Sequence, residues 1–175
     1  MEKLTKKEYM QFKKIEQRIY LLATLLKSKS PPKDFEATTW YDFLNEIKNI
    51  QGNFYNDISF IATLLAKDYL VRKFDIQDFD AAEKAQGASG FDIDLLLNDG
   101  EQIVGEIKTT CPYKEDDLGA QQLESFMKDF RKLHKSNAKY KYFFVTERKT
   151  FDILKKTKYK QEISEIQVVL LTSGG

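Results

Sequence analysis

The chain has 175 residues, of which 42% are apolar and 31% charged, so it can form one folded domain with a helical appendage and is not globally disordered. Its net charge is only +1, and its single cysteine, Cys111, and single histidine, His134, exclude internal disulfides, cysteine-rich zinc sites and multi-histidine metal sites. No signal-like or membrane-spanning segment is visible, so we expect a cytoplasmic protein that does not enter the membrane. Any bound metal should be a hard cation held by oxygen.

Three helices are predicted in the N-terminal part, over residues 4–28, 39–50 and 54–69. The first has apolar residues at alternating spacings of three and four, and Pro31 and Pro32 follow its end. Its expected apolar stripe is Phe12, Ile15, Ile19, Leu22 and Leu26. The second helix should turn Trp40, Phe43, Leu44 and Ile47 inward, and the third Ile58, Ile61 and Leu65. We expect residues 1–36 to form an N-terminal helix and linker, and residues 37–175 to form the main domain.

The second half alternates strands and helices. A polar loop at 75–90 precedes two strands, 91–97 and 102–109, which are joined by the tight-turn sequence Asn98-Asp99-Gly100 and should form an antiparallel hairpin. An amphipathic helix at 119–135, a strand at 139–146, a short helix at 149–156 and a final strand at 166–171 follow. This order predicts an α/β fold with a mixed sheet flanked by helices.

Charged side chains interrupt the otherwise apolar hairpin. Because strand side chains alternate between faces, Asp92 and Asp94 share one face of the first strand, and Glu106 and Lys108 share one face of the second. The hairpin can therefore bring Asp92, Glu106 and Lys108 together at one end. Buried acids are costly unless something neutralises them, and a divalent cation with one lysine would do so.

The spacing of these residues carries a resemblance. Asp92, thirteen intervening residues, and then Glu106-Ile107-Lys108 on a hairpin preceded by a helix resemble the PD-(D/E)xK nuclease superfamily. The local sequence around both motifs looks most like bacterial type II restriction endonucleases, although Phe91 stands where the motif's proline would be. The resemblance covers about residues 53–171. It implies a restriction-endonuclease-like core, with a central mixed β-sheet flanked by helices and an N-terminal helical extension.

The resemblance also implies roles for individual residues. Asp92 and Glu106 would bind Mg²⁺, for which Mn²⁺ can substitute, and Lys108 would be catalytic. Asp94 competes with Asp92 for the place of the first acid, and its position deeper in the strand favours Asp92. An acid on the preceding helix often points at the metal in such families, which suggests Asp57 as a third ligand and Glu46 as a weaker candidate.

The implied substrate is double-stranded DNA. Some family members carry a glutamine on the helix after the hairpin, and Gln121 or Gln122 stands at a comparable place. Lys128 and Lys132 continue a polar face that could follow a phosphate backbone. Residues 128–160 contain twelve Lys or Arg and three acids, a local balance of +9. Because cutting both strands usually needs two sites, we expect a homodimer, with a larger assembly as a possible source of sequence specificity.

Other interpretations remain open at this stage. A repair or recombination nuclease, resembling resolvases or Mrr-like enzymes, would use the same residues. A catalytically silent DNA-binding module would keep the fold without cutting. Taken alone, the short motif is compatible with a surface charge cluster and the lysines with a solvated face.

Overall fold

The structure is a computed structural model that describes residues 4–74, 76, 79–83 and 89–172. It divides into two compact units, one spanning Lys3–Asp57 and the other beginning at Ile58. The predicted boundary after residue 36 differs from this division, because the second helix packs with the first. In the described ranges, no helix is both long enough and apolar enough to cross a membrane.

The first unit consists of helices α1 (Lys6–Ser28) and α2 (Ala37–Gln51) and the start of α3 (Phe54–Lys73). A capping box begins α1: the Thr5 hydroxyl accepts from the Glu8 N–H at 3.1 Å, and the Glu8 carboxylate accepts from the Thr5 N–H at 2.8 Å. All three helices predicted in this part of the chain are present, and α3 continues four residues beyond its predicted end.

Two positions of the apolar stripe predicted for α1 are wrong by one residue, toward the N-terminal end of the helix: Arg18 and Leu25 take the places of Ile19 and Leu26. Leu25 is buried, whereas Ile19 and Leu26 are 55% and 50% exposed. Arg18 lies inward of Ile19 and forms an ion pair with Asp57. Residues three and four positions apart both lie on one side of a helix, so spacing alone cannot distinguish Arg18 from Ile19 or Leu25 from Leu26. A similar correction applies to α2, where Phe43 is buried and Leu44 is 54% exposed.

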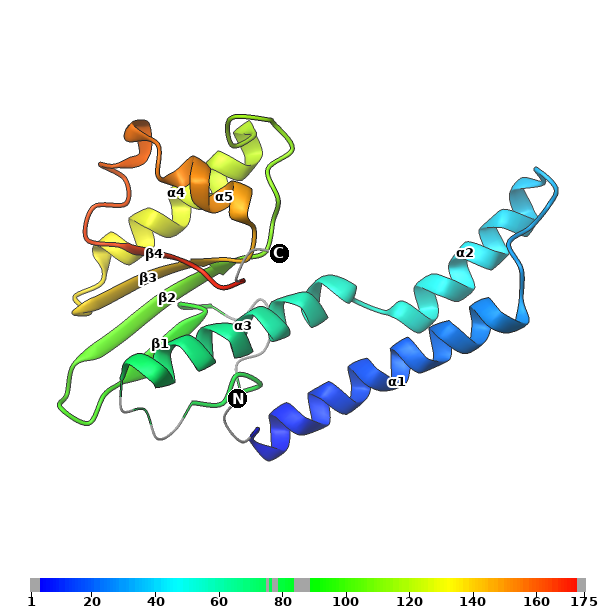
Figure 1. The fold of residues 1–175 in the computed structure, drawn as a ribbon, viewed down its shortest axis with the longest axis horizontal. Coiled ribbons are helices and arrows are strands. Elements are labelled where there is room, and N and C mark those ends of the chain that lie inside the picture. The colour runs from blue at the N-terminus through cyan, green and yellow to red at the C-terminus, as the bar shows by residue number, and fades with distance from the viewer. Residues whose placement is uncertain (1–3, 75, 77–78, 84–88, 173–175) are drawn as a thin grey trace. The chain divides into compact units, whose positions relative to one another are not determined.

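The second unit is built on a four-stranded sheet in the order β1-β2-β3-β4. The strands are β1 (Ile93–Leu96), β2 (Gln102–Lys108), β3 (Tyr140–Val145) and β4 (Gln167–Leu170). The hairpin β1–β2 is antiparallel, and the other two pairings are parallel. Helices α4 (Ala120–Lys135) and α5 (Arg148–Leu154), followed by the 3-10 turn η1 (Thr157–Tyr159), connect the parallel strands. The predicted mixed sheet with flanking helices is confirmed (Figure 1).

Each face of the sheet is covered by helix (Figure 1). Val104, Phe143 and Val145 pack against apolar residues of α4, including Phe126 and Phe130. On the opposite face, Ile93, Ile103 and Phe144 pack against Ala66 and Leu70 of α3. Strand alternation thus places the charged side chains of β2 on the α4 side of the sheet.

The β1–β2 hairpin is closed by a tight turn at one end and is open at the other, where β1 begins. At the turn, the Leu97 N–H donates to the Glu101 carbonyl at 2.8 Å, and Gly100 has a φ of +84°, which favours glycine. At the open end, β1 begins at Ile93 rather than at the predicted residue 91. Strand alternation would place Phe91 on the same face as Ile93, but Phe91 precedes β1 and packs against the α4-side cluster, whereas Ile93 belongs to the α3-side cluster. Positions 75, 77–78 and 84–88 of the predicted 75–90 loop lie outside the described residues.

Candidate functional site

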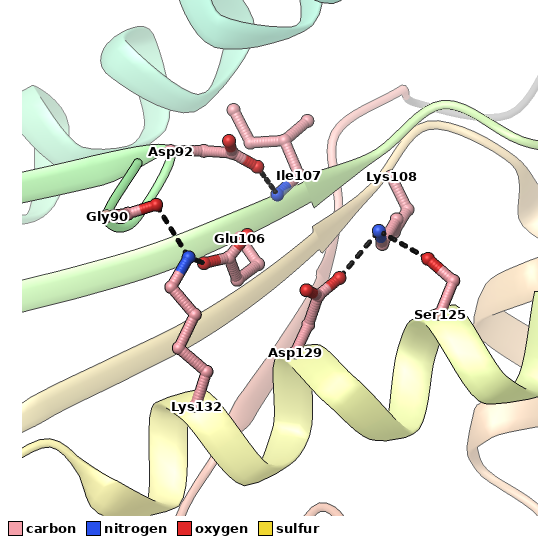
Figure 2. Close-up of polar contacts among 8 residues, drawn as sticks. All are labelled: Gly90, Asp92, Glu106, Ile107, Lys108, Ser125, Asp129 and Lys132. Carbon is pink, nitrogen blue, oxygen red and sulfur yellow. Dashed lines mark hydrogen bonds and ion pairs between the residues drawn. The ribbon is translucent and has the colours of Figure 1, made fainter. Parts of the chain in front are cut away.

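Asp92 and Glu106 lie at the open end of the hairpin. β1 and β2 pair Ile93 with Gly105 and Asp94 with Val104, so continuing this register by one residue sets Asp92 opposite Glu106. One Asp92 carboxylate oxygen, Oδ2, accepts the Ile107 N–H at 2.9 Å (Figure 2). The side chain of Asp92 is thereby held beside β2, while the residue itself stays exposed.

Glu106 is buried on the α4 side, with only 4% of its surface exposed. Its Oε1 forms an ion pair with Lys132 of α4, and the Lys132 Nζ also donates to the Gly90 carbonyl at 2.6 Å (Figure 2). Burial raises the pKa of Glu106 to about 7, with the charges of Asp92 and Asp129 acting in the same direction and Lys132 opposing them. Glu106 is therefore a buried acid whose charged form needs a positive partner beside it.

Lys108 bends toward α4. Its Nζ lies 2.5 Å from Oδ2 of Asp129 and donates to the Ser125 hydroxyl at 3.1 Å (Figure 2). Its strongest contacts are thus with α4 and not with Asp92 or Glu106. Asp129 is buried, so this ion pair is shielded from solvent more than a surface pair.

Asp129 was not predicted as a site residue, and Ser125 was expected only on the polar face of α4 and not as a partner of Lys108. Ser125, Asp129 and Lys132 follow one another at spacings of four and three, which places them on one side of α4. This spacing was the available signal, but the sequence did not show that this side of α4 lies against the end of β2. The sequence-based prediction therefore lacked the helical part of the site.

The predicted DNA-contacting residues of α4 have different environments. Gln122 fixes the start of the helix, because its Oε1 accepts the Gly119 N–H at 3.1 Å and its Nε2 donates to the Cys111 carbonyl at 3.0 Å. Lys132 points to Glu106 instead of outward. Gln121 and Lys128 are exposed, as the prediction of a polar face requires.

The remaining candidate acids have partners of their own. Asp57 is paired with Arg18 and Glu46 with Lys29 at 2.6 Å, and all four residues belong to the first unit. A metal-binding role for Asp57 stays a prediction. Asp94 accepts from the Gln102 side-chain amide at 2.7 Å, two residues nearer the turn than Asp92.

A cavity of about 270 Å³ lies beside β1, and Asp92 is one of the residues that line it. Its lining includes Thr63 of α3, Phe79, Asp80 and the segment from Ser89 to Leu95. Asp92 therefore borders both this cavity and the position of Glu106.

The donor chemistry of the hairpin end suits a hard cation. Asp92 and Glu106 offer carboxylate oxygens from adjacent strands, and water can complete the coordination of Mg²⁺. Among the residues that the structure describes, no group of three or more His, Cys, Asp or Glu side chains is arranged to hold a metal ion. A metal at this place would therefore have two carboxylates as its protein ligands, and Glu106 would have to exchange Lys132 for the ion.

Comparison of the chain with models of protein families, with curated proteins and with solved structures gave no match. A functional assignment therefore depends on the chemistry of the site itself.

Proposed function

We propose that the protein is a Mg²⁺-dependent DNA endonuclease of the PD-(D/E)xK type, most similar to a type II restriction endonuclease. The observation that carries this proposal is the position of Asp92 beside Glu106 at the open end of the hairpin, with Lys108 two residues further along β2. The motif spacing, the hairpin and the order of the following helix and strand all agree with that superfamily's pattern.

The proposed roles follow from the side chains. Asp92 and Glu106 would hold Mg²⁺, and Mn²⁺ could replace it. When bound, the ion lowers the pKa of water and neutralises charge on a phosphoryl oxygen. Lys108 would orient the attacking water or stabilise the negative charge of the transition state, while Asp129 and Ser125 hold its ammonium group in place.

The charge distribution gives limited support to a DNA substrate. Of the twelve basic residues in 128–160, six form ion pairs with described acids, and five of those acids lie outside the stretch. The local excess of positive charge is thus smaller in the fold than in the sequence. Lys128 and Arg131 remain exposed on α4, and we assign phosphate contact to them.

A second candidate function is a silent DNA-binding module of the same fold. The observation that favours it is that α4 already neutralises both Glu106 and Lys108, through Lys132 and Asp129. Such a protein would bind DNA with the same surface and leave it intact.

Nicking of supercoiled plasmid distinguishes the two functions. We expect the full chain to nick DNA with Mg²⁺ and not with Ca²⁺, and Lys108→Ala to lower the rate by ~100-fold, as expected for losing a group that stabilises transition-state charge. Lys160→Ala, at an exposed position, is the matched control. If the wild type and Lys108→Ala bind DNA equally and neither cuts it, the silent module is correct.

A further inference from the structure

The ammonium group of Lys132 occupies an oxygen-lined position. It contacts Oε1 of Glu106 and the carbonyl oxygen of Gly90, two residues before Asp92 (Figure 2). It also lies 4.8 Å from the centre of the Phe91 ring. A carboxylate and a backbone carbonyl are ligands that a hard divalent cation also takes. The lysine therefore stands among oxygens that could coordinate a metal ion.

Lys132 and a divalent ion cannot both contact the same carboxylate oxygen. Glu106 is buried, so its charge needs a close positive partner, and in the described structure that partner is Lys132. Two cations at adjoining places in a poorly solvated site would repel each other strongly. The ion pair and the metal complex are thus alternatives.

We propose that Lys132 is a tethered counter-ion that competes with the divalent cation for Glu106. Binding of the cation requires the ammonium group to leave Glu106 and Gly90. One-third of the Lys132 side chain is exposed, so it has a path into solvent. This inference deepens the proposed function and depends on Glu106 being a metal ligand; it assigns Lys132 to control of metal affinity in place of the DNA contact predicted from sequence.

Binding of Mn²⁺ to the full chain, followed by the electron paramagnetic resonance signal of the free ion at constant pH, tests the competition. We expect Lys132→Met to tighten Mn²⁺ binding by at least about tenfold, which corresponds to about 1.4 kcal/mol. Lys135→Met, at an exposed position one turn along the same helix, should bind Mn²⁺ as the wild type does. Unchanged or weaker binding by a folded Lys132→Met variant overturns the proposal.

Glu106→Gln separates this inference from the proposed function. It should remove Mn²⁺ binding in both the wild-type and the Lys132→Met backgrounds. If it does so while Lys132→Met binds like wild type, the competition is wrong and the metal site stands. If Glu106→Gln leaves Mn²⁺ binding unchanged, both the competition and the proposed metal site fail.

Amine labelling of the wild-type chain gives a second readout that needs no substitution. Acetylation of Lys132, measured by mass spectrometry, should rise severalfold when Mg²⁺ is added, because the freed amine becomes accessible. Acetylation of Lys135 should not change. Equal labelling of Lys132 with and without Mg²⁺, at concentrations that saturate the site, overturns the proposal even if Lys132→Met does not fold.

Discussion

Glu106 gives the site its dependence on pH. Its pKa of about 7 exceeds that of an ordinary glutamate, 4.5, because burial and neighbouring acids disfavour the charged form. Between these two values the folded chain holds a proton that the unfolded chain has released. This group's contribution to the free energy of unfolding therefore falls as pH rises from about 4.5 to about 7.

Replacing Glu106 by glutamine, which does not titrate, should remove this pH-dependent fall in the free energy of unfolding. The free energy of unfolding of Glu106→Gln minus that of wild type should rise by ~2 kcal/mol from pH 5 to pH 8, since one unit of pKa shift corresponds to about 1.4 kcal/mol. Urea unfolding at the two pH values measures the difference. A constant difference between the variant and wild type would contradict the prediction.

Asp129 should affect catalysis through Lys108. If the proposed nuclease activity is present, we expect Asp129→Ala to lower the nicking rate by about tenfold, equivalent to about 1.4 kcal/mol of barrier, because Lys108 loses its anchoring carboxylate. Asp129→Glu should recover part of the rate. A rate insensitive to Asp129→Ala would show that Lys108 needs no such anchor.

At the scale of elements, Gly105 controls how closely the hairpin approaches its neighbours. A Cβ atom added there would lie 3.2 Å from the Phe144 ring and 3.4 Å from the Cβ of Ile93. We expect Gly105→Ala to lower the free energy of unfolding by about 1–3 kcal/mol, the usual cost of overpacking a core. Leu96→Ala, at a site 76% exposed on β1, is the control for urea unfolding. Equal unfolding midpoints for the two variants would contradict the prediction.

The exposed side of α4 should determine how DNA binding depends on salt. Lys128→Gln combined with Arg131→Gln should reduce the slope of log K against log salt concentration by about 2, because each duplex phosphate contact contributes roughly 0.9. Fluorescence anisotropy over a range of salt concentrations measures this slope. An unchanged slope would remove these two residues from the proposed DNA interface.

The elements differ in how well their sequences predicted them. Period-two alternation correctly placed Glu106 and Lys108 on one face of β2, because a strand has only two faces; Ile103 and Ile107 lie on the other face in the structure. A helix surface is continuous, so two positions of the predicted α1 stripe, Ile19 and Leu26, were wrong by one residue. The pairing of Lys108 with Asp129 depends on how α4 packs on the sheet. The sequences around these two residues do not reveal that packing.

At the scale of the whole molecule, double-strand cutting leads us to expect a homodimer. Two strands of opposite polarity are cut most directly by two sites related by a twofold axis. Sedimentation equilibrium of the full chain should give a protein mass about twice the 20.4 kDa of one chain, both without DNA and, after the mass of the duplex is subtracted, with DNA. A single-chain mass under both conditions would instead favour a larger assembly with other proteins, or the silent module.

The sheet topology also affects the order in which the chain assembles. The β1–β2 hairpin joins residues close in sequence, whereas each parallel pairing joins strands separated by a helix. Closing the shorter loop loses less entropy. During folding, the two acids should therefore meet early and repel each other until α4 arrives with Lys132, so that the helix completes both the core and the charge balance in a single late step.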